Sequence, residues 1–173
     1  KIFRLTKKGK VDLEIFEGST INTPSLLATE DYIDALKWAE SIGGLEALQA
    51  RANANTKVLA DWAARTPWGD FLAEDAGTRS NTSVCLKVVD PRVTGLSEDA
   101  QAEFAKKLAA LLEKEGAALD AASYRSAPPG LRIWCGGTIE AADVEKLTPW
   151  LDWAFSTLAA ELAQGRVSPS RAC

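Results

Sequence analysis

Two arginines flank a turn of sequence Ala-Pro-Pro-Gly at residues 127–130: Arg125 precedes the turn and Arg132 follows it. If the strands predicted on either side pair as a hairpin, the two guanidinium groups emerge near one another, and like charges facing across a strand pair destabilise it. A carboxylate or phosphate bound between them would turn this repulsion into a net attraction, because the planar guanidinium group suits both anions. From spacing alone, two solvated arginines at the end of a hairpin are the simpler interpretation.

A second polar group, Asn22-Thr23-Pro24, has the donors to bind a phosphate. It offers a carboxamide, a hydroxyl and a backbone N–H before a rigid residue, as anion-binding turns do. Pro24 also biases Thr23 away from helical backbone angles. On these residues alone, an Asx or Ser/Thr turn leading into a helix is the favoured interpretation.

The composition excludes several kinds of chemistry. Histidine is absent, so Ser-His and Cys-His arrangements cannot occur, and without a CxxC pair a zinc site is not expected. The sequence has no Gly-rich phosphate loop and no GxGxxG motif. The net charge of −4 gives no electrostatic basis for binding nucleic acid or an anionic membrane. We therefore expect no metal site, no nucleic-acid partner and no membrane association.

Cys85, Cys135 and Cys173 are odd in number and far apart, and two of them lie in apolar, strand-like surroundings. Buried, reduced thiols explain this better than a disulfide framework does, which predicts a cytoplasmic protein. The 173 residues suffice for one sizeable domain, or for a small domain with pieces of a neighbour. Methionine is absent, so either the initiator was removed or the chain is part of something longer.

The elements that must position the polar residues fall into two groups. In residues 1–65 we predict short strands at 2–5 and 13–16, a helix from near Thr29 to Gly43-Gly44, and a second helix that ends at Thr66-Pro67. These residues lack enough strands to close a core alone, and we interpret them as the tail of another domain.

From residue 66 onward the predicted order is strand, helix, strand, strand, helix. The predicted ranges are a strand at 83–89, a helix at 97–115 capped by Ser97, strands at 121–126 and 131–135, and a helical region at 140–163 with a break at Thr148-Pro149. This order predicts a small α+β domain, a mostly antiparallel sheet with helices on one face.

Four segments, taken together and in order, resemble one family. They are Thr-Ile-Asn-Thr-Pro-Ser-Leu-Leu at 20–27, Trp-Ala-Glu-Ser-Ile-Gly-Gly-Leu at 38–45, Thr-Arg-Ser-Asn-Thr-Ser-Val-Cys at 78–85 and Gly-Leu-Arg-Ile-Trp-Cys-Gly-Gly at 130–137. Over nearly the whole chain they resemble the phosphoserine aminotransferases. Arg-Ile-Trp at 132–134 with Pro-Trp-Leu-Asp-Trp at 149–153 resembles the variant associated with alphaproteobacterial members.

The resemblance implies the carboxyl-terminal part of a fold-type-I, α/β transferase that uses pyridoxal 5'-phosphate and works as a homodimer. The family moves an amino group between glutamate and 3-phosphohydroxypyruvate in serine biosynthesis, with phosphohydroxythreonine of vitamin B6 biosynthesis as a second substrate. By the same resemblance, residues 1–65 end the large cofactor-binding domain and residues 66–173 form the small carboxyl-terminal domain.

The resemblance also implies roles for single residues. Asn22 and Thr23 match the pair that reaches the cofactor phosphate of the neighbouring subunit, and Arg132 matches the Gly-x-Arg arginine that grips the substrate carboxylate. Arg125 is the nearest match to an upstream arginine that holds the anionic end of the substrate. The chain departs from the family there, because Tyr124 stands where many members have histidine and the spacing to Arg132 is one residue longer.

In the family, the Schiff-base lysine, the aromatic residue stacked on the cofactor and the aspartate at the pyridine nitrogen all precede this region. Lys57, Lys87 and Lys146 have no flanking residues that mark a Schiff-base lysine. The cofactor needs that lysine as anchor and proton shuttle. We therefore predict no catalytic residue in this chain and no transamination by the chain without its missing amino-terminal half.

Two other interpretations remain open. The chain could be a standalone α+β module that binds an amino acid or a phosphorylated acid through Arg125 and Arg132, or part of another fold-type-I transaminase acting on a different acid. Exposed apolar surface on residues 1–65 would favour the enzyme part over the module, since a complete module would cover that face.

Overall fold

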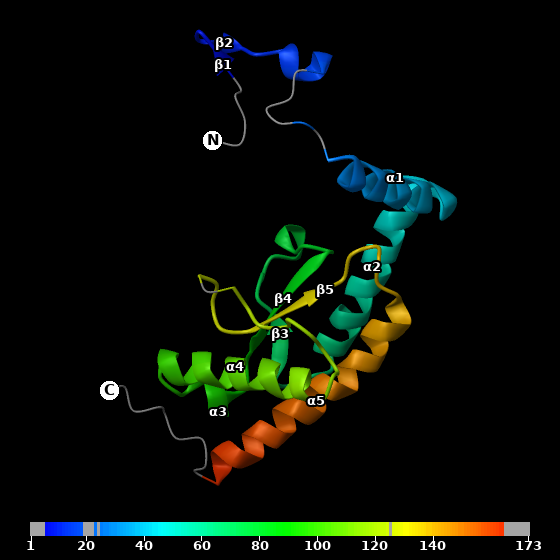
Figure 1. Ribbon diagram of the computed structural model, residues 1–173. Helices are drawn as coiled ribbons and strands as arrows, with labels where there is room; N and C mark the ends of the chain where they lie inside the picture. Colours follow the sequence, from blue (N-terminus) through cyan, green and yellow to red (C-terminus); the bar gives the residue numbers. More distant parts are fainter. Residues whose placement is uncertain (1–5, 19–22, 24, 125, 165–173) are drawn as a thin grey trace. The chain divides into compact units, whose positions relative to one another are not determined.

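The computed structural model describes residues 6–18, 23, 25–124 and 126–164. The chain divides into two compact units, Lys1–Gly44 and Leu45–Cys173. Figure 1 traces the elements of each. None of the helices within the described ranges combines the length and the apolar character that a membrane span needs.

The first unit holds a small hairpin, a 3-10 turn and one helix. Strands β1 (Thr6–Lys7) and β2 (Lys10–Val11) pair antiparallel through a turn in which Lys8 and Gly9 both have positive φ. The strand predicted at 13–16 is wrong, because Glu14–Glu17 form a 3-10 helix. Its cause is local: the Asp12 carboxylate accepts the Glu14 N–H and turns the chain. The strand predicted at 2–5 lies outside the described residues.

Helix α1 (Leu26–Ser41) begins three residues before the predicted start at Thr29. Ser25 is the N-cap, because its hydroxyl accepts the N–H of Ala28 at 3.3 Å, while the Thr29 hydroxyl donates to the Ser25 carbonyl. No residue of α1 is buried. Its large apolar side chains stay in solvent, with exposed fractions of 81% for Leu26 and 67% for Tyr32.

The second unit contains a three-stranded antiparallel sheet in the order β3-β4-β5 with helices packed against it (Figure 1). This confirms the predicted fold class. The elements are α2 (Gly44–Ala63), β3 (Gly69–Phe71), η2 (Ala76–Thr78), β4 (Ser83–Val88), α3 (Pro91–Thr94), α4 (Glu98–Lys114), β5 (Leu131–Trp134) and α5 (Ala141–Ala163).

One core joins the sheet to α2, α4 and α5. Trp68 stacks on Phe155 of α5 with ring centroids 4.4 Å apart and meets Trp62 of α2 edge-on. The Asp152 carboxylate accepts both indole N–H groups, so these buried donors are satisfied. The buried apolar residues that surround this cluster include Leu59, Val84, Leu86, Phe104, Leu108, Leu112, Leu131, Ile133 and Leu151.

Helix α2 packs with the second unit rather than the first, since Leu59 and Trp62 are 0% and 1% exposed within its core. The chain therefore divides at Gly44 and Leu45. The predicted boundary near residue 65 concerns the domains of a complete enzyme and stays a prediction.

Helix α5 runs without a break through Pro149, so the break predicted at Thr148-Pro149 is wrong. Proline has no N–H to donate to the carbonyl four residues earlier, that of Glu145. The Thr148 hydroxyl donates to that carbonyl instead, at 3.0 Å. Because the orphaned acceptor is satisfied, the helix continues.

Of the cysteines within the described ranges, both are free: Cys85 is partly exposed and Cys135 is buried. Burial raises the pKa of the Cys135 thiol to about 11. The nucleophile in alkylation is the thiolate, which this shift makes scarce at neutral pH.

We expect iodoacetamide at pH 8 to modify Cys85 well before Cys135, with Cys135 reacting only once denaturant unfolds the second unit. Peptide mass mapping of each site checks this; equal rates in native buffer would contradict the packing.

Candidate functional site

The sheet has one buried and one open face, because side chains alternate along β4 and β5. Val84, Leu86, Leu131 and Ile133 point into the core, all 5% exposed or less. The residues between them face the other way. In the register of the two strands, Cys85 lies opposite Arg132 and Ser83 opposite Trp134. The open face therefore carries the hydroxyl and thiol of β4 next to the indole and guanidinium group of β5.

Gly130 allows β5 to approach β4 closely enough for this pairing. A Cβ at position 130 would lie 2.1 Å from the carbonyl oxygen of Leu86, a distance that no side chain tolerates. Glycine is required here for close approach of two backbones rather than for an unusual φ. Gly130 thus determines where Arg132, two residues on, emerges.

The connection after α4 supplies the partner of Arg132. Gly116, with φ of 69°, ends the helix, and the chain then returns along β5, where the Arg132 N–H donates to the Ala121 carbonyl at 2.8 Å. Asp120 precedes this contact and has a φ of 53°, a left-handed conformation that aspartate tolerates better than most residues. The turn points its carboxylate at the arginine.

Arg132 is held by two neighbours. Its Nη2 donates to Oδ2 of Asp120 at 2.8 Å, and its guanidinium carbon lies 4.3 Å from the centre of the Tyr124 ring. The arginine side chain is 21% exposed and the aspartate side chain 86%. Among the described residues, no group accepts a hydrogen bond from Nε or Nη1 of Arg132. Each of the two guanidinium forks therefore keeps one nitrogen, Nε or Nη1, that no described residue engages, and shares Nη2 with Asp120.

A cavity of about 210 Å³ opens beside this group, lined by Ser83, Leu119, Asp120, Arg132 and Trp134. Trp134 forms one wall, with its indole N–H donating to the Thr138 hydroxyl at 3.4 Å. Gly136 leaves room for that ring, because a Cβ there would lie 2.4 Å from it. The wall is thus the last residue of β5, supported by the loop that follows the strand.

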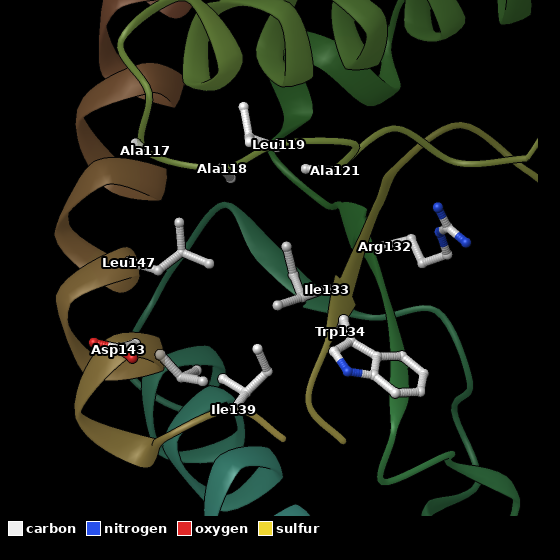
Figure 2. A pocket seen from close by; sticks show the side chains of 11 residues that line it. Ala117, Ala118, Leu119, Ala121, Arg132, Ile133, Trp134, Ile139, Asp143 and Leu147 are labelled. Atoms are coloured by element: carbon white, nitrogen blue, oxygen red, sulfur yellow. The ribbon is translucent and has the colours of Figure 1, made fainter. Parts of the chain in front are cut away.

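A second cavity, of about 240 Å³, lies on the other side of β5 and is mostly apolar. Figure 2 shows Leu147, Ile139 and Asp143 on one side of the strand, while the Arg132 and Trp134 side chains point away from them. Arg132 and Trp134 border both cavities, and the remaining lining of this one is apolar except for Asp143. The open-face cavity, where Arg132 meets Asp120, is therefore the candidate site for an anion.

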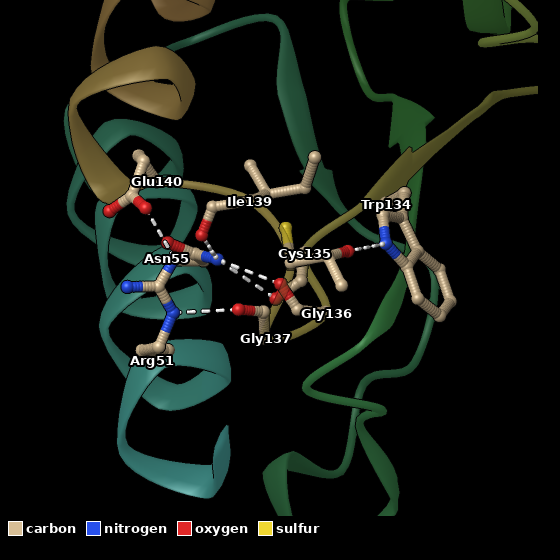
Figure 3. Close-up of polar contacts among 9 residues, drawn as sticks. Arg51, Asn55, Trp134, Cys135, Gly136, Gly137, Ile139 and Glu140 are labelled. Carbon is tan, nitrogen blue, oxygen red and sulfur yellow. Dashed lines mark hydrogen bonds and ion pairs between the residues drawn. The ribbon is translucent and has the colours of Figure 1, made fainter. Parts of the chain in front are cut away.

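Helix α2 fixes the loop that follows Trp134 and supports its ring (Figure 3). Asn55, only 1% exposed, donates through Nδ2 to the carbonyls of Cys135, Gly136 and Ile139 at 3.0 to 3.2 Å. Arg51 donates to the Gly137 carbonyl and pairs with Glu140. The Asn55 Oδ1 atom is buried without a partner in the part that the structure describes. Reversing the amide would aim that oxygen at three carbonyls, so the present orientation is the favourable one.

The predicted site residues have different outcomes. Arg132 lies on the open sheet face, and Thr23 is exposed in the first unit. Asn22 and Arg125 lie outside the described residues. The strand predicted at 131–135 is β5, but the one predicted at 121–126 is wrong: its described residues give only an isolated antiparallel bridge, between Ala122 and Leu131, and the ladder partner of β5 is β4.

Sequence reasoning missed two residues that contact Arg132. Asp120 gives no local signal, because a left-handed turn after a helix is not distinguishable from other loop aspartates in a single sequence. Tyr124 stood out as a departure from the resembling family, and the structure places its ring under the guanidinium group. Within the described ranges, no group of His, Cys, Asp or Glu side chains could hold a metal ion.

Comparison with known proteins identifies relatives of the chain. No protein-family model matches it. It is 54% identical over 155 residues to a phosphoserine aminotransferase of Methanosarcina mazei and 52% identical over 156 residues to that of Methanosarcina barkeri. A phosphoserine aminotransferase of Corynebacterium glutamicum is 32% identical over 139 residues. The two Methanosarcina matches cover 90% of this chain but only 39% and 40% of those proteins.

These matches place the chain among the aminotransferases. Over its matched length it belongs to the phosphoserine aminotransferase family, and the part it matches is the carboxyl-terminal part of the relatives. The chain spans about two-fifths of the length of those curated relatives. The alphaproteobacterial form of the resemblance stays a prediction.

The Asn55 contacts give a test of how the site is held. Replacing Asn55 with Ala removes three hydrogen bonds and leaves buried carbonyls unsatisfied, which costs about 2–3 kcal/mol of the free energy of unfolding. Asn53→Ala, on the same helix, removes one exposed hydrogen bond to Asn81 and should cost less than about 0.5 kcal/mol. Urea unfolding of both variants measures the difference; equal stabilities would contradict the role of Asn55.

Proposed function

We propose that this chain is the carboxyl-terminal part of a phosphoserine aminotransferase. The complete enzyme would transfer an amino group between glutamate and 3-phosphohydroxypyruvate in serine biosynthesis, with Arg132 binding the substrate carboxylate. The observation that carries the proposal is the identity of more than half of the aligned residues with curated phosphoserine aminotransferases over 90% of the chain.

The open-face cavity supports the role of Arg132. A carboxylate takes two parallel hydrogen bonds from a guanidinium fork, which pairs Nη2 with either Nε or Nη1. Described residues do not engage Nε or Nη1 of Arg132, and Nη2 binds the exposed Asp120 carboxylate. The Tyr124 ring lies against the guanidinium group and restricts the arginine side chain, so less side-chain entropy remains to be lost on binding. Arg132 thus has the geometry of a preorganised anion-binding residue.

The surface of α1 favours part of an enzyme over a standalone binding module. Leu26, Leu27, Tyr32, Leu36 and Trp38 are 81%, 73%, 67%, 47% and 39% exposed on one helix without a buried residue. Soluble monomers rarely leave so many large apolar side chains in water. We infer that other residues of the complete protein cover this helix.

The described residues do not by themselves form a site for pyridoxal phosphate. The cavity at Arg132 has no lysine in its lining, and Lys87, on the same face of β4, pairs with Glu74 at 3.2 Å. Thr23 belongs to the first unit. We therefore assign the anchoring of the cofactor to residues beyond this chain.

The proposal includes several finer assignments that follow from the family resemblance. The enzyme would be a cytoplasmic homodimer in which Asn22 and Thr23 reach the cofactor phosphate of the neighbouring subunit. Arg125 would assist Arg132 at the anionic end of the substrate, and phosphohydroxythreonine of vitamin B6 biosynthesis would be a second substrate. Residues 66–173 would form the small domain and residues 1–65 the end of the large one.

The chain alone should not hold the cofactor. We expect that incubating the 173-residue chain with pyridoxal phosphate and reducing with borohydride, which fixes the cofactor to any lysine amine it has joined, gives no stoichiometric adduct. The complete protein, treated identically, should carry one cofactor on a lysine outside this chain. Mass spectrometry of the tryptic peptides decides; a stoichiometric adduct on Lys57, Lys87 or Lys146 would refute this division of roles.

The role of Arg132 is testable in the complete protein. Arg132→Gln removes a charged, bidentate donor, and we expect kcat/KM for glutamate to fall about 10- to 100-fold, mainly through a higher KM. Arg65→Gln is the matched control, because Arg65 is exposed and donates only to the Asp61 carbonyl among described groups. Steady-state kinetics with melting curves separates binding from folding. Unchanged kinetics in a folded Arg132→Gln enzyme would contradict the assignment.

A further inference from the structure

We propose that Asp120 is an internal competitor for Arg132: its carboxylate occupies the guanidinium group in the absence of ligand and leaves when the carboxylate of an acid binds. Asp120 would then set the affinity of the site for acids. This inference rests on the proposed binding role of Arg132.

The contact between Asp120 and Arg132 is chemically the one that a substrate acid would make, but it is incomplete. One carboxylate oxygen, Oδ2, receives one hydrogen bond from Nη2 at 2.8 Å. The Nη2 atom also lies 3.5 Å from the Asp120 carbonyl oxygen, so both contacts use the same nitrogen. A carboxylate that approaches with both oxygens forms two parallel bonds, which are stronger and better oriented than one. Geometry therefore favours the incoming acid.

The energetics also favour exchange. The Asp120 side chain is 86% exposed, so solvent screens the pair and stabilises the released carboxylate. Ion pairs of this kind contribute about 0–1 kcal/mol. Arg132, at 21% exposed, gains more from a partner than Asp120 does. When a bound acid takes the place of the Asp120 carboxylate, the guanidinium group keeps an anionic partner.

The backbone around Asp120 permits release without unfolding. The residues before it are held at the end of α4 through Ala117 and Ala118, whose N–H groups donate to Leu112, and Ala121 is held to β5. Rotation about the side-chain bonds of Asp120 can therefore remove the carboxylate while the turn stays. The Tyr124 ring contacts the same guanidinium group independently of the Asp120 carboxylate. The ring is then a constant platform and the aspartate the exchangeable partner.

The test uses the complete protein and glutarate, a dicarboxylate that has no amino group to transfer. Asp120→Asn keeps the size and tolerates the positive φ, but it removes the competing charge. We expect the glutarate Kd measured by calorimetry to fall about two- to five-fold, which is the loss of a competitor worth up to ~1 kcal/mol. Asp61→Asn, which breaks the exposed pair with Lys57, is the matched control and should leave the Kd unchanged.

A double-mutant cycle separates competition from a general effect of charge. In an Arg132→Gln background, titrated at higher glutarate concentration, Asp120→Asn should have no effect on the Kd. An effect of Asp120→Asn that persists without Arg132 would mean that the aspartate charge acts on the ligand directly, and this overturns the proposal. So does an unchanged or raised Kd in the single Asp120→Asn variant, because a residue that only positions Arg132 would weaken binding when lost.

The cycle does not depend on turnover. A protein that shows the expected cycle but does not transaminate glutamate would contradict the proposed function and leave the exchange at Arg132 standing. A protein that transaminates glutamate but fails the cycle would contradict only the role of Asp120.

Discussion

The site depends on the antiparallel pairing of β4 with β5. That pairing puts Leu131 and Ile133 into the core and Arg132 on the open face, and a shift by one residue would exchange them. It is possible only because Gly130 has no side chain to meet the Leu86 carbonyl. The burial of apolar residues on one face therefore determines where the cation on the other face lies.

The rest of the second unit secures this strand from both ends. After β5, Asn55 of α2 binds three carbonyls of the loop and so fixes the Trp134 wall. Before β5, the turn at Asp120 contacts the strand twice: the Ala121 carbonyl accepts the Arg132 N–H, and the Asp120 carboxylate accepts from the Arg132 side chain. The same helix α2 brings Trp62 against Trp68 and Asp152, joining loop, sheet and α5. The contacts of α2 thus hold together both the core and the loop that borders the site.

The sequence predicted the elements that have strong local signals. The helix at 97–115 and the strands at 83–89 and 131–135 agree with α4, β4 and β5 within one or two residues, because apolar periodicity and the Ser97 cap are encoded locally. Strand β3 could not be predicted, since Gly-Asp-Phe has no strand pattern and pairs only because β4 is beside it. The continuity of α5 depends on one hydroxyl at Thr148, which propensity does not register.

The candidate site was also predictable only in part. Arg132 follows from the arginine's place in a strand and from the family resemblance, whereas Asp120 and Tyr124 are brought to it by tertiary structure. We have proposed that Arg132 binds the carboxylate of an acid on the open face of the sheet. A crystal structure of the complete protein with bound glutarate tests it most directly. We expect a glutarate carboxylate on two nitrogens of Arg132, with Asp120 turned away. Glutarate bound elsewhere, with Asp120 still on Arg132, would contradict it.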